Sequence, residues 1–192
     1  MPIVTVIPAP GRFAMTGEIV PLTNADLNVV SRDFNHLLKR DNNHDIAGEF
    51  PNFVKKCVQG EANVRDALSR ARESISPGRT EMFIVFSGVY AVGLSVVTND
   101  VEAPRDVGNP DWPNLSGFVC HPFRGRGLGR LSIEKRMEVV DDNFGGKAWT
   151  LVRDGNAVSE HLVTSAGFKR VSSDNQKIDN RHLYTYSKDS IE

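Results

Sequence analysis

The sequence lacks the features that mark several large classes of protein. It has only two cysteines, Cys57 and Cys120, so we expect no disulfide framework and favour a reduced, cytoplasmic setting. No apolar run approaches the roughly 18 residues that a membrane span needs. The first ten residues have no basic region ahead of their short apolar stretch, unlike a signal peptide. We therefore expect no association with a membrane.

Charge of either sign is not in excess. Lys and Arg number 23 against 24 Asp and Glu, and this balance argues against a nucleic-acid-binding domain. Hydrophobic residues make up 40% of the chain, as in ordinary globular proteins. A chain of 192 residues fits one domain. We predict a single domain over residues 1–192, with the proline-rich residues 1–15 as an extended lead-in.

The spacing of apolar residues predicts a mixed α/β fold. A short strand at Ile19 and Val20 precedes a helix over residues 27–38, for which Thr23 stands as the expected cap. A second helical region begins near Asn52, breaks at Gly60 and stops at residues 76–78. The remaining expected elements are a hairpin over 82–97, a strand at 115–120, a helix at 126–143 capped by Gly145-Gly146, a strand at 148–152, a helix at 157–166, a strand after Gly167, and a last strand at 182–186.

One segment carries most of the chemical information. Residues 117–131 read Gly-Phe-Val-Cys-His-Pro-Phe-Arg-Gly-Arg-Gly-Leu-Gly-Arg-Leu, in which a strand ends and a helix begins inside a run of glycines and arginines. Glycines let backbone N–H groups crowd together, and a helix N-terminus attracts anions. Arg124, Arg126 and Arg130 add positive charge. Because hydrogen bonds to a charged group contribute about 1.5–3 kcal/mol each, such a loop suits a pyrophosphate.

Three phosphate-binding patterns compete for this loop. A Walker A loop requires a lysine that is absent here, and in a dinucleotide fingerprint the third glycine would come one residue later. The pattern Arg/Gln-x-x-Gly-x-Gly/Ala is met by Arg124, Gly127 and Gly129. This pattern resembles the acyl-CoA loop of the GNAT superfamily of N-acetyltransferases. Residues 148–152, Asn156 and the Ala-Gly-Phe at 166–168 resemble the second motif of that family, and the resemblance covers about residues 83–171.

The resemblance implies a GNAT-like sheet, mixed and mostly antiparallel, flanked by helices. It also implies that the chain moves an acetyl group from acetyl-CoA to a primary amine by direct attack on the thioester, without a metal. Main-chain groups of Phe118 and Val119 would contact the cofactor, and Asn156 would reach its pantetheine arm, although Asn156 is equally suited to cap a helix. The remaining residues expected to bind the cofactor are Arg124, Gly125, Arg126, Gly127, Leu128, Gly129 and Arg130.

The acid and base commonly found in this family are missing. Many relatives have a tyrosine seven residues after the asparagine, and some have a glutamate five residues before it; here those positions are Val163 and Leu151. A lysine-like amine, with a pKa of about 10.4, is mostly protonated at neutral pH and needs a base. His121, just past the strand end, is the candidate base, and Tyr184 in the last strand is the candidate acid.

The acceptor pocket is expected from three segments, at residues 33–50, 99–114 and 174–181. The first two are rich in Asp, Glu and Asn, which suits a cationic amine on a small molecule or a peptide. Two other functions remain open: a domain of the same fold that binds acyl-CoA without catalysis, and a phosphate-binding regulatory domain that shares only the basic loop. The sequence does not distinguish a monomer from a homodimer.

Overall fold

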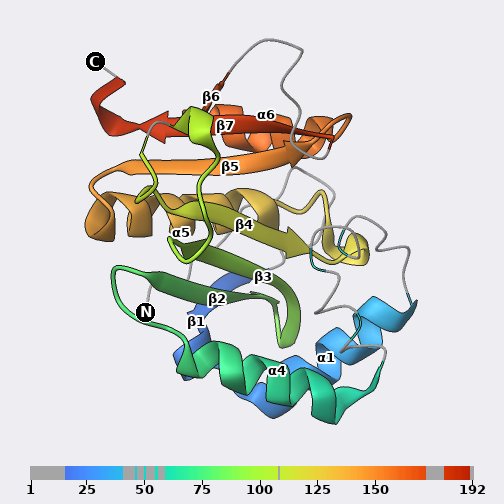
Figure 1. The fold of residues 1–192 in the computed structure, drawn as a ribbon. Coiled ribbons are helices and arrows are strands. Elements are labelled where there is room, and N and C mark those ends of the chain that lie inside the picture. Colours follow the sequence, from blue (N-terminus) through green and yellow to red (C-terminus); the bar gives the residue numbers. More distant parts are fainter. Residues whose placement is uncertain are drawn as a thin grey trace. The chain divides into compact units, whose positions relative to one another are not determined.

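The structure is a computed structural model, and it describes residues 16–40, 46, 50, 55, 59–107, 109–171 and 180–190. Seven strands form one sheet in the order β1-β2-β3-β4-β5-β7-β6 (Figure 1). The strand β1 pairs antiparallel with β2, and β7 pairs antiparallel with both β5 and β6. The strand β4 (Asn114–Val119) meets β5 (Lys147–Arg153) in parallel, with Asn114 opposite Trp149. The predicted mixed, mostly antiparallel α/β fold is confirmed.

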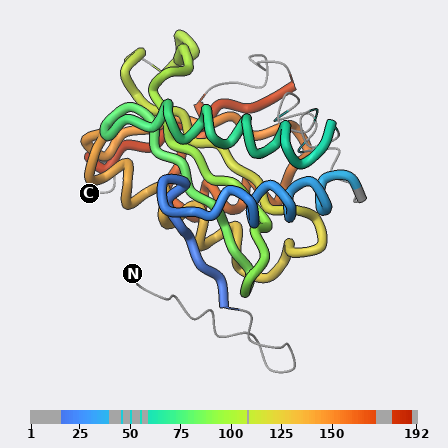
Figure 2. The backbone as a smooth tube through the Cα atoms, turned by 90° about the horizontal axis from the view of Figure 1, so that it is seen from below, coloured from blue at the N-terminus to red at the C-terminus, as the bar shows by residue number. Residues whose placement is uncertain are grey.

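The chain divides into two compact units, and the first comprises residues 1–75, 82–95 and 117–132. In it β1 (Gly17–Pro21) pairs with β2 (Thr80–Ser87), which continues through a turn into β3 (Tyr90–Thr98). The helices α1 (Leu27–Arg40) and α4 (Glu61–Glu73) lie side by side in Figures 1 and 2. Their inward stripes include Phe34 and Val64, both 0% exposed. The guanidinium of Arg72 on α4 donates to the carbonyls of Leu22 and Ala25 before α1, which fixes the start of that helix.

The second unit comprises residues 76–81, 96–116 and 133–192. Here β5 pairs along its whole length with β7 (Arg181–Ser187), and the short β6 (Lys169–Arg170) pairs with β7. The helix α6 (Ala157–Ser165) follows β5, and α5 (Leu128–Asn143) enters this unit with its later residues. Trp149 is 2% exposed and packs with Val107 and Leu183 in the core of this unit.

Two sequence-based expectations about helix ends have different outcomes. Thr23 is not the cap of α1, because it lies in a 3₁₀ turn (Leu22–Asn24) and the helix begins at Leu27. Asp26 takes that place instead, since its Oδ1 accepts the N–H of Asn28 at 2.9 Å. The predicted glycine cap of α5 is confirmed: Gly146 has a φ of +69° and donates its N–H to Val140 at 3.0 Å. Most of the expected helical region before Gly60 lies outside the described residues.

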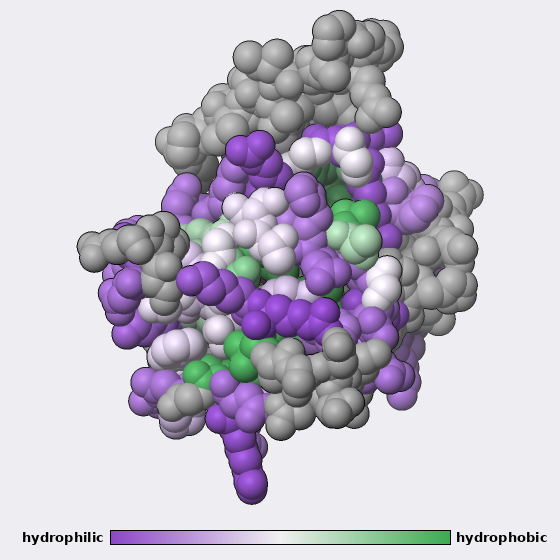
Figure 3. All heavy atoms as spheres, turned by 90° about the horizontal axis from the view of Figure 1, so that it is seen from above, coloured by the Kyte–Doolittle hydropathy of each residue, from purple (hydrophilic) through white to green (hydrophobic). Residues whose placement is uncertain are grey.

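The surface of the described residues is mainly polar. On the face drawn in Figure 3, hydrophilic residues predominate and hydrophobic ones show in small patches. The most exposed large hydrophobic side chains are Val89, Tyr90, Val101 and Val158. Single exposed apolar residues of this kind are normal for proteins. Within the described residues, no helix combines the length and the apolar character that crossing a membrane would require.

Candidate functional site

The loop singled out in the sequence connects β4 to α5 in the first unit. After β4 ends at Val119, residues His121–Phe123 form a 3₁₀ turn, and α5 begins at Leu128. Cys120 donates its N–H to the carbonyl of Val92 on β3 at 2.8 Å, and its side chain is buried. Arg124 reaches back with its Nε–H to the carbonyl of Val119 at 2.8 Å. The end of the strand and the entrance to the loop are therefore held together by hydrogen bonds.

Two glycines give the loop a backbone shape that other residues rarely adopt. Gly125 has a φ of +71° and Gly127 a φ of +82°, both in the left-handed region. The carbonyl of Gly127 accepts the N–H of Leu131 at 3.0 Å and so opens the hydrogen-bond ladder of α5. At such a start, backbone N–H groups point out of the first turn and favour an anion. This geometry fits a pyrophosphate of a nucleotide-like cofactor.

One side chain of the loop, that of Leu128, is buried, and the arginine side chains are exposed. Leu128 is 2% exposed and packs with Val85 and Val92, so any contact of Leu128 with a cofactor would come from its main chain. The guanidinium of Arg126 lies 5.4 Å from the centre of the Phe123 ring, in a cation–π arrangement. The residues exposed to solvent are Arg124, Gly125, Arg126, Gly127 and Arg130, with Gly129 partly buried. The structure thus brings the predicted loop residues together at one exposed helix start.

The other sequence-predicted residues of the first unit flank this loop. The side chain of Phe118 is buried, and its ring centre lies 5.7 Å from that of Phe34 and 5.3 Å from that of Phe50. Because the ring of Phe118 is buried, a cofactor contact would come from its main chain, and this contact stays a prediction. His121 is exposed, and its carbonyl accepts the N–H of Arg124 at 3.2 Å. Its role as a base stays a prediction.

Asn156, in the second unit, caps α6. Its Oδ1 accepts the N–H of Ser159 at 3.2 Å, so the capping role left open by the sequence is confirmed. A cofactor contact from the same side chain stays a prediction. Val163 is buried in α6, and Leu151 of β5 is partly buried near Trp149. Both positions that carry acid–base groups in relatives are therefore apolar packing positions here.

Tyr184 has a partner that the sequence did not indicate. Its hydroxyl donates to Oε1 of Glu160 on α6 at 2.6 Å, and its side chain is 1% exposed. Burial, followed by the hydrogen bond and the charge of Glu160, raises the pKa of Tyr184 to about 12. Because a thiol has a pKa of about 8.5, a tyrosine with this pKa would give its proton to a thiolate only against an unfavourable difference. Tyr184 and Glu160 are 24 residues apart in the sequence, and no local sequence pattern predicts their hydrogen bond.

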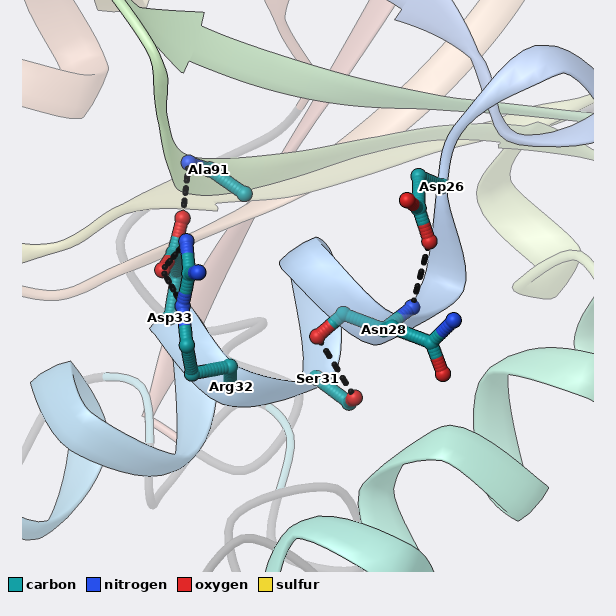
Figure 4. Close-up of polar contacts among 6 residues, drawn as sticks. All are labelled: Asp26, Asn28, Ser31, Arg32, Asp33 and Ala91. Atoms are coloured by element: carbon teal, nitrogen blue, oxygen red, sulfur yellow. Dashed lines mark hydrogen bonds and ion pairs between the residues drawn. The ribbon is translucent and has the colours of Figure 1, made fainter.

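The acidic residues expected to bind a cationic acceptor are not all available for that. Asp33 on α1 is 6% exposed, and its Oδ2 accepts the N–H of Ala91 at 2.9 Å (Figure 4). Its Oδ1 accepts from Arg32, also at 2.9 Å. Asp33 thus joins α1 to the start of β3, and the expectation that the segment 33–50 helps to form an acceptor pocket stays a prediction. Much of the segments 33–50 and 174–181 lies outside the described residues.

Trp112, in the second expected segment, also packs against the core of its unit. It packs partly buried against the cluster of Val107, Trp149 and Leu183, and its carbonyl accepts the indole N–H of Trp149 at 2.8 Å. Among the residues that the structure describes, no group of three or more His, Cys, Asp or Glu side chains is arranged to hold a metal ion.

Comparison with known proteins gives a clear result for the fold. No protein-family model matches the sequence, and no curated protein matches it. The fold is similar to that of RimJ from Mycobacterium smegmatis, solved in complex with CoA-disulfide, with a TM-score of 0.63 and 10% identity over 93% of this chain and 89% of that one. A ribosomal-protein alanine acetyltransferase from Vibrio fischeri matches with a TM-score of 0.62 and 12% identity over 98% of this chain and 99% of the other.

A third solved structure, the N-acetyltransferase PseH from Campylobacter jejuni, matches with a TM-score of 0.54 and 12% identity over 90% of this chain and 98% of that one. Identities this low show a shared fold. The resemblance to the GNAT superfamily is therefore confirmed at the level of the fold: the chain is folded like these acetyltransferases over nearly their whole length.

Proposed function

We propose that this protein transfers an acetyl group from acetyl-CoA to a primary amine by direct attack on the thioester. The observation that carries the proposal is the loop from β4 to α5, where Gly125 and Gly127 shape the backbone ahead of an exposed helix start bordered by arginines. The same fold holds CoA in RimJ. Acetyl-CoA, once bound, supplies an acetyl group already activated as a thioester.

The residues of the first unit have distinct tasks in this proposal. Backbone N–H groups at the start of α5 hold the pyrophosphate, and the arginines of the loop add attraction for its charge. Arg124 also fixes the loop by its bond to Val119, and in this proposal the main chain of Phe118 and Val119 orients the pantetheine arm. Donors held in place in this way can also stabilise developing negative charge on the reacting carbonyl.

The acceptor is proposed to be the amine of a small molecule or a peptide. PseH is an N-acetyltransferase and RimJ was solved in complex with CoA-disulfide, but neither name identifies the acceptor of this chain. We further propose that the chain works as one cytoplasmic domain, as a monomer or a homodimer.

Thermal unfolding with and without acetyl-CoA tests the cofactor. A ligand at 100 times its Kd adds about 2.7 kcal/mol to the free energy of unfolding, enough for a clear rise in Tm. ATP and NAD serve as controls, because a general phosphate-binding loop would respond to them as well. A rise specific to acetyl-CoA supports the proposal, and an equal or larger rise with ATP or NAD contradicts it.

An amine screen that follows thiol release then tests the reaction. Release that depends on both acetyl-CoA and an amine is the expected result. Binding of acetyl-CoA without release for any amine would instead assign the chain to the non-catalytic acyl-CoA-binding proteins of this fold.

A further inference from the structure

The aromatic residue at the entrance to the cofactor loop is held firmly in the first unit. Phe123 ends the 3₁₀ turn after β4, and its N–H donates to the carbonyl of Cys120 at 3.0 Å. Its side chain is partly buried and packs against the buried cluster that includes Leu128. Both the backbone and the ring of Phe123 are therefore fixed by the core of this unit.

Arg126 has a much more flexible local sequence than Phe123. It lies between Gly125 and Gly127, and its long side chain is exposed. Glycine leaves the backbone free on either side, and an arginine side chain has many rotamers to lose on ordering. The guanidinium nevertheless lies 5.4 Å from the centre of the Phe123 ring, within the roughly 6 Å reach of a cation–π contact. The ring thus restrains a side chain that its neighbours in sequence leave flexible.

This contact lies at the exposed helix start that we assign to the pyrophosphate. Arg126 comes two residues before Leu128, where α5 begins. Arg124, on the other side of Gly125, is held by its hydrogen bond to the carbonyl of Val119. A charged side chain that is ordered before its ligand arrives loses less entropy on binding than a freely rotating one. Both arginines that precede the helix are therefore restrained, one by a carbonyl and the other by a ring.

We propose that Phe123 positions Arg126 for the pyrophosphate of the acyl donor, and that Phe123 acts on the donor only through Arg126. This inference rests on the proposed function, because it gives the pair a task in the same cofactor loop. The chemical group that the pair recognises is a diphosphate, which the guanidinium of Arg126 binds by charge and hydrogen bonds. Phe123 itself has no contact with the donor.

Two other roles for Phe123 predict a different pattern of effects. As a packing residue alone, Phe123 would support the loop backbone through the core. As a binding residue, its ring would contact the cofactor directly. In both cases a substitution at Phe123 still weakens binding after Arg126 is removed. In the proposed role it has no further effect, because the side chain that it positions is gone.

The test is a double-mutant cycle of Phe123→Leu and Arg126→Ala, with the Kd for acetyl-CoA measured by isothermal titration calorimetry. Leucine keeps an apolar side chain against the core and removes the aromatic face. Arg126→Ala should raise the Kd about tenfold or more, as for loss of a charge-assisted hydrogen bond. Phe123→Leu should raise it about 2- to 10-fold, the cost of ordering one flexible side chain. The double variant should bind like Arg126→Ala alone.

Ring-fluorinated phenylalanines at position 123 test the same contact with little change in side-chain shape. Fluorine withdraws electron density from the face of the ring and so weakens its attraction for a cation. The Kd should rise stepwise with the number of fluorine atoms when Arg126 is present, and it should not change in Arg126→Ala. Phe123→Tyr keeps the aromatic face and should bind like the wild type. A role in packing alone would give no such stepwise dependence.

Two further variants control for packing and for charge. Ile19 of β1 is partly buried against the same cluster as Phe123, so Ile19→Ala should lower the Tm of the free protein and leave the Kd unchanged. Arg65 is an exposed arginine on α4. Combining Arg65→Ala with Phe123→Leu should give the Kd of Phe123→Leu alone.

The outcomes separate this inference from the function on which it rests. An unchanged Kd in either Phe123→Leu or Arg126→Ala, or effects that multiply in the double variant, would overturn the positioning role and leave the acetyltransferase proposal standing. A wild type that does not bind acetyl-CoA would overturn both. If Phe123→Leu fails to fold, the fluorinated series decides, and a Kd independent of fluorination would refute the inference.

Discussion

The Nε–H of Arg124 donates to the main-chain carbonyl of Val119 at 2.8 Å. The bond closes a short turn of chain between the end of β4 and the loop that leads to α5. It holds the guanidinium against the strand end, so the charge of Arg124 stands beside the backbone expected to bind the pantetheine arm. Because Arg124 both shapes the loop and supplies charge, we expect it to contribute to cofactor binding although its side chain is exposed.

Arg124→Ala should raise the Kd for acetyl-CoA about tenfold or more. One charge-assisted hydrogen bond contributes about 1.5–3 kcal/mol, and 1.4 kcal/mol corresponds to a factor of ten in Kd. Isothermal titration calorimetry measures the effect. Arg65→Ala, an exposed arginine on α4, is the control and should leave the Kd unchanged. An unchanged Kd in Arg124→Ala would remove Arg124 from the cofactor site.

Gly127→Ala should damage both stability and cofactor binding. Its φ of +82° places an alanine in the left-handed region, at a cost of about 1–2 kcal/mol. Gly88→Ala is the control: Gly88 has a φ of +58° in the β2–β3 turn, so an alanine there is strained in the same way but lies away from the loop. Urea unfolding should show similar losses for the two alanine variants. Only Gly127→Ala should weaken acetyl-CoA binding, and equal binding by both would mean that the loop backbone does not hold the cofactor.

Asp33→Ala should lower the free energy of unfolding by about 1–3 kcal/mol, because the buried N–H of Ala91 would lose its acceptor. Asp66→Ala, an exposed aspartate on α4, should stay within about 0.5 kcal/mol of the wild type. Urea denaturation at neutral pH measures both. Full stability in Asp33→Ala would contradict the structural role of its bond to Ala91.

The sequence predicted well what depends on neighbouring residues. The β2–β3 hairpin, the glycine cap of α5 and the loop around Gly127 follow from local turn and helix chemistry, and each is found where expected. The cap of α1 was misplaced because Thr23 and Asp26 are both good caps, and the bonds of Arg72 to Leu22 and Ala25 hold the turn before the helix. The hydrogen-bond partners of Asp33 and Glu160 were missed for another reason: they lie 58 and 24 residues away in the sequence.

Tyr184 predicts a loss of stability in alkaline solution. Its pKa is raised to about 12 in the folded protein from about 10 unfolded, so the folded state holds the proton more tightly. The stability that depends on this difference in pKa is fully present below pH 10 and is lost as the pH rises from about 10 to 12. The wild type should therefore lose more stability than Tyr184→Phe over this pH range, as urea unfolding at a series of pH values measures. Tyr90→Phe, at an exposed tyrosine, should show a constant difference.

Asn156 has a confirmed capping role and a proposed cofactor contact, and one pair of substitutions separates them. Asn156→Ala removes both and should cost about 1 kcal/mol of stability, because the N–H of Ser159 loses its acceptor. Asn156→Ser keeps a good capping oxygen, so its stability should stay near that of the wild type. The serine side chain is shorter and has no amide, however, and a contact with the pantetheine arm would be lost. We therefore expect Asn156→Ser to unfold like the wild type and to bind acetyl-CoA more weakly.

The control for this substitution is Asp26→Ser, which exchanges one good cap for another at the start of α1 and should alter neither stability nor binding. Paired urea unfolding and calorimetry on the three variants give the result. Should Asn156→Ser bind acetyl-CoA as tightly as the wild type, Asn156 acts only as a cap. Its contribution would then be to fix the first turn of α6 through the N–H of Ser159.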